Sequence, residues 1–178
     1  SHIEGDGGGI LTHGGSAANL TAMCAARAAV APDSWTHGTP ENLVVLASDE
    51  AHYSIARALS IMGMGQQSII PVKTNDLKVM LPEHLQNAYN LSKSQGKKIM
   101  AVIANACTTA TGLYDPLEEI GQFCHKNKLW FHIDGAYGGA AILSKKGSQI
   151  LKGIEKADSS SSNLPASILL ISKMSLRI

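Results

Sequence analysis

Four short polar segments carry most of the side chains that could do chemistry: residues 12–19, 48–52, 107–112 and 132–139. In the first segment, Gly14, Gly15 and Ser16 come directly before an expected helix. Glycines let a backbone approach an anion closely, and the free amides of a helix N-terminus carry partial positive charge. The segment could therefore bind a phosphate. A tight turn with Ser16 or Asn19 as the helix cap is an equal alternative.

The strongest single signal is Asp134, which ends an apolar run. A buried carboxylate is costly unless it is paired with a cation, a metal or a ligand. Gly135, Gly138 and Gly139 follow it and leave room for a flat or bulky group. A buried Asp that caps the next turn is the alternative. Neither a second carboxylate nor a set of metal ligands accompanies Asp134, so we expect no metal site.

The other two segments carry weaker signals. A lone histidine in a loop, such as His52, is more often a surface or structural residue than a functional one. The threonines of residues 108–111 could donate to a ligand oxygen, although a Thr-rich turn that bonds its own backbone is the more ordinary interpretation. All four segments nevertheless fall where strands are expected to end or helices to begin, and open parallel sheets bind ligands beyond the carboxyl ends of their strands.

The elements that must position these residues alternate along the chain. Apolar runs predict strands at 42–47, 68–72, 98–105 and 129–134, and helical spacing predicts helices at 19–30, 52–62, 81–95 and 117–127, with a polar loop at 33–42. Short strands separated by helices imply parallel pairing with right-handed crossovers. The continuous apolar run at 100–104 implies a sheet covered on both faces. Residues 163–178 have no clear place in this pattern, although 168–171 could be a strand.

The amino-acid composition argues against two classes of binding partner, nucleic acids and membranes. The chain has 178 residues, with 15 Lys plus Arg against 14 Asp plus Glu. Without a basic excess we expect no nucleic-acid partner. No apolar run reaches the ~18 residues of a bilayer span, so we expect no membrane partner. Three cysteines without short-range spacing argue against a disulfide framework and for a reducing compartment, which we take to be the cytoplasm.

In their order and spacing, the four segments resemble the pyridoxal 5'-phosphate-dependent amino-acid decarboxylases, the group that includes the glutamate, aromatic amino-acid and diaminobutyrate enzymes. The resemblance rests on residues 9–20, 49–54, 106–112, 115–119 and 129–139 and covers about residues 7–159. It implies an α/β protein with the aspartate aminotransferase-like fold (fold type I), in which residues 1–159 form part of the large, cofactor-binding domain and residues 160–178 are a divergent tail. It also implies pyridoxal phosphate as cofactor, an amino-acid substrate that loses its α-carboxylate, and a homodimer.

The resemblance also assigns roles to individual residues. The positions that bind the cofactor correspond to Gly15, Ser16, His52, Thr109, Asp134, Ala136 and Asn163. Gly15 and Ser16 match the residues that bind the phosphate, and His52 matches the histidine that stacks on the pyridine ring. Asp134 matches the carboxylate that pairs with the ring nitrogen. His52 and Asp134 are therefore the expected catalytic residues.

One departure from the family is serious. Members follow Ala-Asp-Ser, after a few residues, with a His-Lys pair whose lysine forms the Schiff base with the cofactor. Here Ala166 stands where that lysine is expected, and the next lysine, Lys173, is seven residues late. A frameshift or a truncated reading would produce such an abrupt loss, and the family's N-terminal segment and small domain are also missing. We therefore expect an inactive fragment; the alternatives are a non-catalytic cofactor-binding remnant and another fold type I lyase, such as a cysteine desulfurase or a sphingosine-phosphate lyase.

Overall fold

One mixed sheet organises the protein. The computed structural model describes residues 8–164 and 166–171, with side chains through residue 162. Within these residues the sheet has seven strands in the order β1-β7-β6-β5-β4-β2-β3. The strands are β1 Gly8–Thr12, β2 Leu43–Ser48, β3 Ile69–Val72, β4 Lys98–Asn105, β5 Trp130–Gly135, β6 Ser159–Leu164 and β7 Ala166–Ile171. The five from β3 to β6 pair in parallel, whereas β7 runs antiparallel to both β6 and β1. This confirms the predicted α/β class with a mostly parallel sheet.

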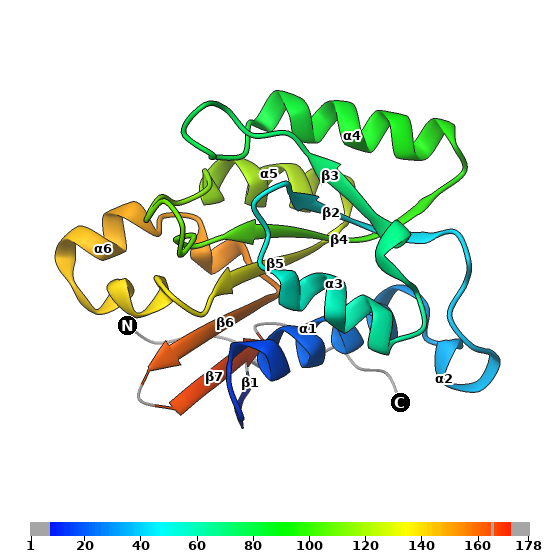
Figure 1. Ribbon diagram of the computed structural model, residues 1–178, viewed down its shortest axis with the longest axis horizontal. Helices are drawn as coiled ribbons and strands as arrows, with labels where there is room; N and C mark the ends of the chain where they lie inside the picture. The colour runs from blue at the N-terminus through cyan, green and yellow to red at the C-terminus, as the bar shows by residue number, and fades with distance from the viewer. Residues whose placement is uncertain (1–7, 165, 172–178) are drawn as a thin grey trace.

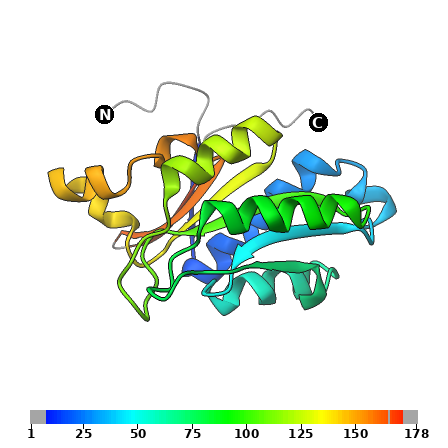
Figure 2. The same cartoon turned by 90° about the horizontal axis from the view of Figure 1, so that it is seen from above.

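Helices cover both faces of the sheet (Figure 1). They are α1 Gly15–Val30, α2 Ser34–His37, α3 Tyr53–Ile61, α4 Pro82–Ser94, α5 Leu117–Asn127 and α6 Lys145–Ile150, with short 3₁₀ turns η1 Gln66–Ser68, η2 Gly139–Leu143 and η3 Ile154–Lys156. The apolar faces of α1 and α3 pack against one side of the sheet. Those of α4 and α5 pack against the other, and Figure 2 gives a second view of the same layers. The central strands are accordingly apolar almost throughout, and every residue of β2 is buried.

The structure differs from the elements expected from the sequence at several places. Helix α1 begins at Gly15 rather than residue 19, so the glycine-rich segment forms its first turn. The expected loop at 33–42 contains the short helix α2. Residues 8–12 form an edge strand, β1, which their glycine content concealed.

The serine-rich segment that follows Asp158 is a strand in the sheet. Ser159 and Ser161 of β6 are buried beside β5. The hydroxyl of Ser159 lies 2.9 Å from His132 Nδ1 and accepts a hydrogen bond from Trp130 Nε1. A strand can be made of serines here because its inward hydroxyls satisfy polar groups of β5. The possible strand at 168–171 is confirmed as part of β7. Lys173 lies outside the described residues.

Candidate active site

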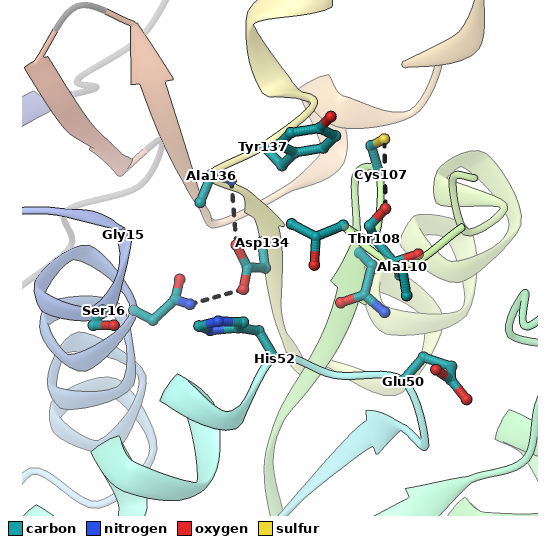
Figure 3. Close-up of a pocket in the computed structure, with 13 residues that line it drawn as sticks. Gly15, Ser16, Glu50, His52, Cys107, Thr108, Ala110, Asp134, Ala136 and Tyr137 are labelled. Carbon is teal, nitrogen blue, oxygen red and sulfur yellow. Dashed lines mark hydrogen bonds between the residues drawn. The ribbon is translucent and has the colours of Figure 1, made fainter. Parts of the chain in front are cut away.

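A cavity of about 270 Å³ lies beyond the carboxyl ends of β2, β4 and β5, beside the start of α1. Six residues expected to bind a ligand line it together: Gly15, Ser16, His52, Thr109, Asp134 and Ala136. They come from four separate segments of the chain, and Figure 3 shows several of them around one space. The structure therefore places the four polar segments at one site.

Two positions stand apart from this group. Asn163 belongs to β6, but its side chain lies outside the described part of the structure. Ala166 begins β7, directly across the sheet hairpin from Leu164.

The first turn of α1 forms one wall of the cavity. Its N-cap, Gly14, has φ 99°, a value that favours glycine, and no described side chain caps the helix. A Cβ atom added to Gly15 would stand 2.8 Å from Cβ of Ala136. Gly15 thus lets the first turn of α1 pack closely against Ala136, just after β5, and the cavity lies beside this N-terminal end of the helix.

Asp134 is the central acidic group of the site and only 8% exposed. Its Oδ2 accepts a hydrogen bond from Asn19 Nδ2 at 2.8 Å. Its Oδ1 accepts from the backbone N–H of Ala136 at 3.2 Å (Figure 3) and also from Ser161 Oγ at 3.2 Å. None of the ion pairs among the described residues includes Asp134. The carboxylate is thus oriented by neutral donors, and its charge is available to a cationic group in the cavity.

His52 forms the N-cap of α3 and lines the same cavity. Its Nδ1 accepts the backbone N–H of Ser54 at 3.3 Å and lies 2.7 Å from the Ser54 hydroxyl oxygen. The ring is therefore held by one nitrogen, its centroid lies 4.2 Å from that of the Tyr53 ring, and the residue as a whole remains exposed. A flat ligand ring could stack on it.

The loop that carries Thr109 is held in place by Asp115. This buried carboxylate accepts the backbone N–H groups of Met80 at 2.8 Å and Asn105 at 2.7 Å. Burial raises the pKa of Asp115, although these hydrogen bonds favour the ionised form. The hydroxyls of Thr108 and Thr111 accept the backbone N–H groups of Thr111 at 3.4 Å and Leu113 at 3.3 Å, as the turn-forming interpretation predicts.

Sequence reasoning missed several residues of the site. Asn19, Glu50, Asn105, Cys107 and Tyr137 also line the cavity. Asn19 could have been found from its helical spacing, because it lies on the same buried face of α1 as Ala22, Met23 and Ala26. A polar side chain on such a face needs buried partners.

Two further surveys concern other kinds of site. Among the described residues, no three His, Cys, Asp or Glu side chains group as metal ligands. In the same part of the chain, no helix combines the length and the apolar character needed to cross a bilayer.

Comparisons with known proteins extend these observations. The family model described as "Pyridoxal-dependent decarboxylase conserved domain" matches residues 1–173. The match continues past residue 159, and the boundary that we expected there stays a prediction. Among curated proteins, the acidic amino acid decarboxylase GADL1 of Xenopus tropicalis is 40% identical over 156 residues, which are 86% of this chain and 30% of the relative. The aromatic-L-amino-acid decarboxylase of Bacillus atrophaeus is 40% identical over 151 residues, or 85% and 30% of the two chains.

Solved structures show the same likeness. The crystal structure of mouse CSAD in its apo form superposes with a TM-score of 0.92 at 34% identity, covering 98% of this chain and 39% of that one. Oryza sativa TDC with PLP and tryptamine has a TM-score of 0.86 at 26% identity, covering 97% and 38%. The chain therefore spans about a third of the length of the proteins that it resembles.

Proposed function

Because the chain belongs to the family of pyridoxal-dependent decarboxylases, whose cofactor is pyridoxal 5'-phosphate, we propose that it carries the cofactor-binding part of an enzyme that removes the α-carboxylate of an L-amino acid. The observation that supports this best is the joint placement of Asp134, His52 and the start of α1 around one cavity. These groups offer an anion, a flat ring face and a set of backbone amides, one for each part of a phosphorylated pyridine.

The residues of the cavity fit such a group. Asp134 is a buried carboxylate surrounded only by neutral hydrogen-bond donors, and a protonated ring nitrogen would supply the missing positive charge. Gly15 and Ser16 line the cavity at the uncapped start of α1, so a phosphate there could approach the amides of the helix N-terminus. The roles of Gly15, Ser16, His52, Thr109, Asp134, Ala136 and Asn163 remain those proposed from the family resemblance.

Each residue would contribute a separate task. The bound cofactor supplies a protonated ring that accepts the electrons released when a bond to the substrate Cα breaks. Asp134 would accept a hydrogen bond at the ring nitrogen and favour the presence of a proton there. His52 would stack on one ring face and exclude water from it. The first turn of α1 would bind the phosphate and fix the ring in register with Asp134.

We further propose that this chain is inactive as written, because Ala166 stands where a Schiff-base lysine is expected. Such a lysine binds the cofactor covalently and moves protons near the substrate Cα. Loss of general acid–base help alone typically reduces a rate by ~10²–10⁴-fold. The cofactor would then be held only by phosphate, stacking and ring-nitrogen contacts.

Membership of the family supports only a general proposal for the substrate and the partners. Relatives carry names for acidic, cysteine sulfinic and aromatic amino acids, so we propose an L-amino acid without a narrower class. A homodimer and a cytoplasmic location are proposed on the resemblance and on the cysteine usage.

The proposal has a direct test. The chain is incubated with pyridoxal phosphate, reduced with borohydride and mapped by mass spectrometry, while carbon dioxide release from L-amino acids is measured in parallel. We expect saturable cofactor binding by equilibrium dialysis, scattered labelling of surface lysines and no carbon dioxide. Absence of saturable binding would contradict the cofactor-binding role. Stoichiometric labelling of Lys173 together with carbon dioxide release would contradict the inactivity.

The second candidate is a remnant whose only remaining capacity is to bind pyridoxal phosphate, and Ala166 is the observation that favours it. The two differ in the coding DNA across codons 159–178. A His-Lys pair encoded in a neighbouring frame would indicate a broken enzyme gene, whereas its absence from all frames would favour the remnant.

A further inference from the structure

Asn19 of α1 lines the cavity, and its side chain forms hydrogen bonds to residues of both α3 and β5. The side chain is fully buried on the apolar face of α1. A buried amide is costly unless its N–H and C=O groups are paired, and Asn19 meets this requirement at both ends. Its Nδ2 donates to Asp134 Oδ2 at 2.8 Å and to Ser54 Oγ at 2.9 Å. Its Oδ1 lies 3.1 Å from His132 Nε2.

The direction of the hydrogen bond to His132 follows from burial. His132 is fully buried, and this burial lowers its pKa to about 4 against the opposing charge of Asp134, so its ring carries a single N–H near neutral pH. The Asp134 carboxylate accepts, so the Asn19 amide has one orientation, with Nδ2 toward Asp134 and the carbonyl oxygen toward His132. A carbonyl oxygen can only accept, so the N–H of His132 is on Nε2. His132 Nδ1 then accepts the hydroxyl proton of Ser159.

The hydroxyl of Ser54 connects Asn19 to His52. Ser54 Oγ accepts from Asn19 Nδ2, so its own proton points to His52 Nδ1 at 2.7 Å. The backbone N–H of Ser54 donates to the same nitrogen. A neutral His52 held in this way carries its proton on Nε2, the nitrogen that Ser54 leaves free.

We propose that Asn19 is a positioning residue that sets both the orientation of the Asp134 carboxylate and the tautomer of His52, and so prepares the cavity for a phosphorylated pyridine ring. The Asn19 amide thereby orients Asp134, which would meet the ring nitrogen, and, through Ser54, His52, which would meet the ring face. The inference rests on the proposed function for the identity of the ligand. The hydrogen bonds among Asn19, Asp134, Ser54 and His132 do not depend on that identity.

The first test uses the ligand-free 178-residue chain. Nitrogen chemical shifts of the histidine rings, assigned with His52→Asn, report which ring nitrogen carries the proton. We expect the wild type to show His52 and His132 with the proton on Nε2, and Asn19→Leu to shift His52 toward a mixture of tautomers. Ser54→Ala, which cuts only the link between Asn19 and His52, should give the same shift for His52.

The second test compares two probes by titration. 4'-Deoxypyridoxine 5'-phosphate has the ring nitrogen but no aldehyde to react with lysines, whereas benzyl phosphate lacks the nitrogen. We expect Asn19→Leu to weaken binding of the pyridine probe about tenfold, because hydrogen bonds to a charged group are among the stronger ones, and to leave benzyl phosphate within about twofold. Ala22→Gly is the matched control, since it weakens the same buried face of α1 without removing a hydrogen-bonding side chain.

The outcomes separate this inference from the proposed function. If the wild type binds neither probe, the proposed function fails, while the histidine shifts still decide whether Asn19 sets the network. If Asn19→Leu and Ala22→Gly weaken both probes equally, Asn19 is merely structural and the inference is wrong. Unchanged His52 shifts in both Asn19→Leu and Ser54→Ala would also overturn it. Should Asn19→Leu not fold, the Ser54→Ala shifts alone decide the link to His52.

Discussion

At the scale of single residues, the close packing of α1 against Ala136 depends on the absence of a side chain at position 15. A Cβ at position 15 would stand 2.8 Å from Cβ of Ala136, closer than such atoms pack. We expect Gly15→Ala to weaken 4'-deoxypyridoxine 5'-phosphate binding at least tenfold and to lower the free energy of unfolding by about 1–3 kcal/mol through overpacking. Gly8→Ala is the control, because a Cβ there meets open space. Equal affinities in calorimetric titrations of Gly15→Ala and wild type would refute this.

A second residue-scale prediction concerns pH. Burial lowers the pKa of His132 from 6.5 to about 4, so the unfolded chain binds this proton more readily. Stability from the neutral ring is therefore complete above pH 6.5 and is lost as the pH falls toward 4, by on the order of 3 kcal/mol. Urea unfolding from pH 7 to 4 should show this loss in the wild type and a smaller one in His132→Gln. The exposed His37→Gln should keep the wild-type slope; identical slopes in all three would exclude His132 as the cause.

At the scale of elements, the spacing of apolar residues was sufficient to predict a helix or strand wherever that element buries apolar side chains in the core. Strands β2, β4 and β5 and helices α4 and α5 were predictable within one or two residues for this reason. Strand β6 was not, because its serines are stabilised by partners on β5 rather than by burial of apolar surface. Asn19 was missed for a related reason, since its partners Ser54 and Asp134 are 35 and 115 residues away.

One carboxylate joins two elements next to the cavity. Asp115, between β4 and α5, accepts the N–H of Met80 before α4 and that of Asn105 at the end of β4. Asp115→Asn places an amide donor against one of these N–H groups, and an unsatisfied buried donor costs about 2 kcal/mol. We expect that loss of stability in urea unfolding at pH 7, and weaker probe binding because the loop with Thr109 loosens. Asp76→Asn, exposed in the preceding loop, should change neither; equal stability of the two variants would count against this role of Asp115.

At the scale of the whole molecule, considerable apolar surface is left uncovered. Leu11 is 69% exposed and Leu143 76%, and Ile10 and Tyr137 are at least half exposed. Ile10 and Leu11 belong to β1, which forms one edge of the described sheet. The opposite edge, β3, has four residues and includes Pro71, which lacks a backbone donor. An edge strand with exposed apolar side chains is a template for pairing with another chain. Of the two edge strands, β1 is therefore more prone than β3 to pair with a second copy of the protein.

We therefore expect the isolated chain to self-associate through β1. Sedimentation velocity at rising protein concentration should show species larger than the monomer in the wild type. A lysine on an edge strand opposes pairing because its charge would have to be desolvated, so Leu11→Lys should shift the distribution toward monomer. Leu91→Lys makes the same change at a residue of α4 that is 56% exposed and far from the edge, and it should leave the distribution unchanged. A wild-type chain that stays monomeric at all concentrations and melts cooperatively would show that the exposed surface is tolerated, and equal effects of the two lysines would show that net charge, rather than the β1 edge, controls association.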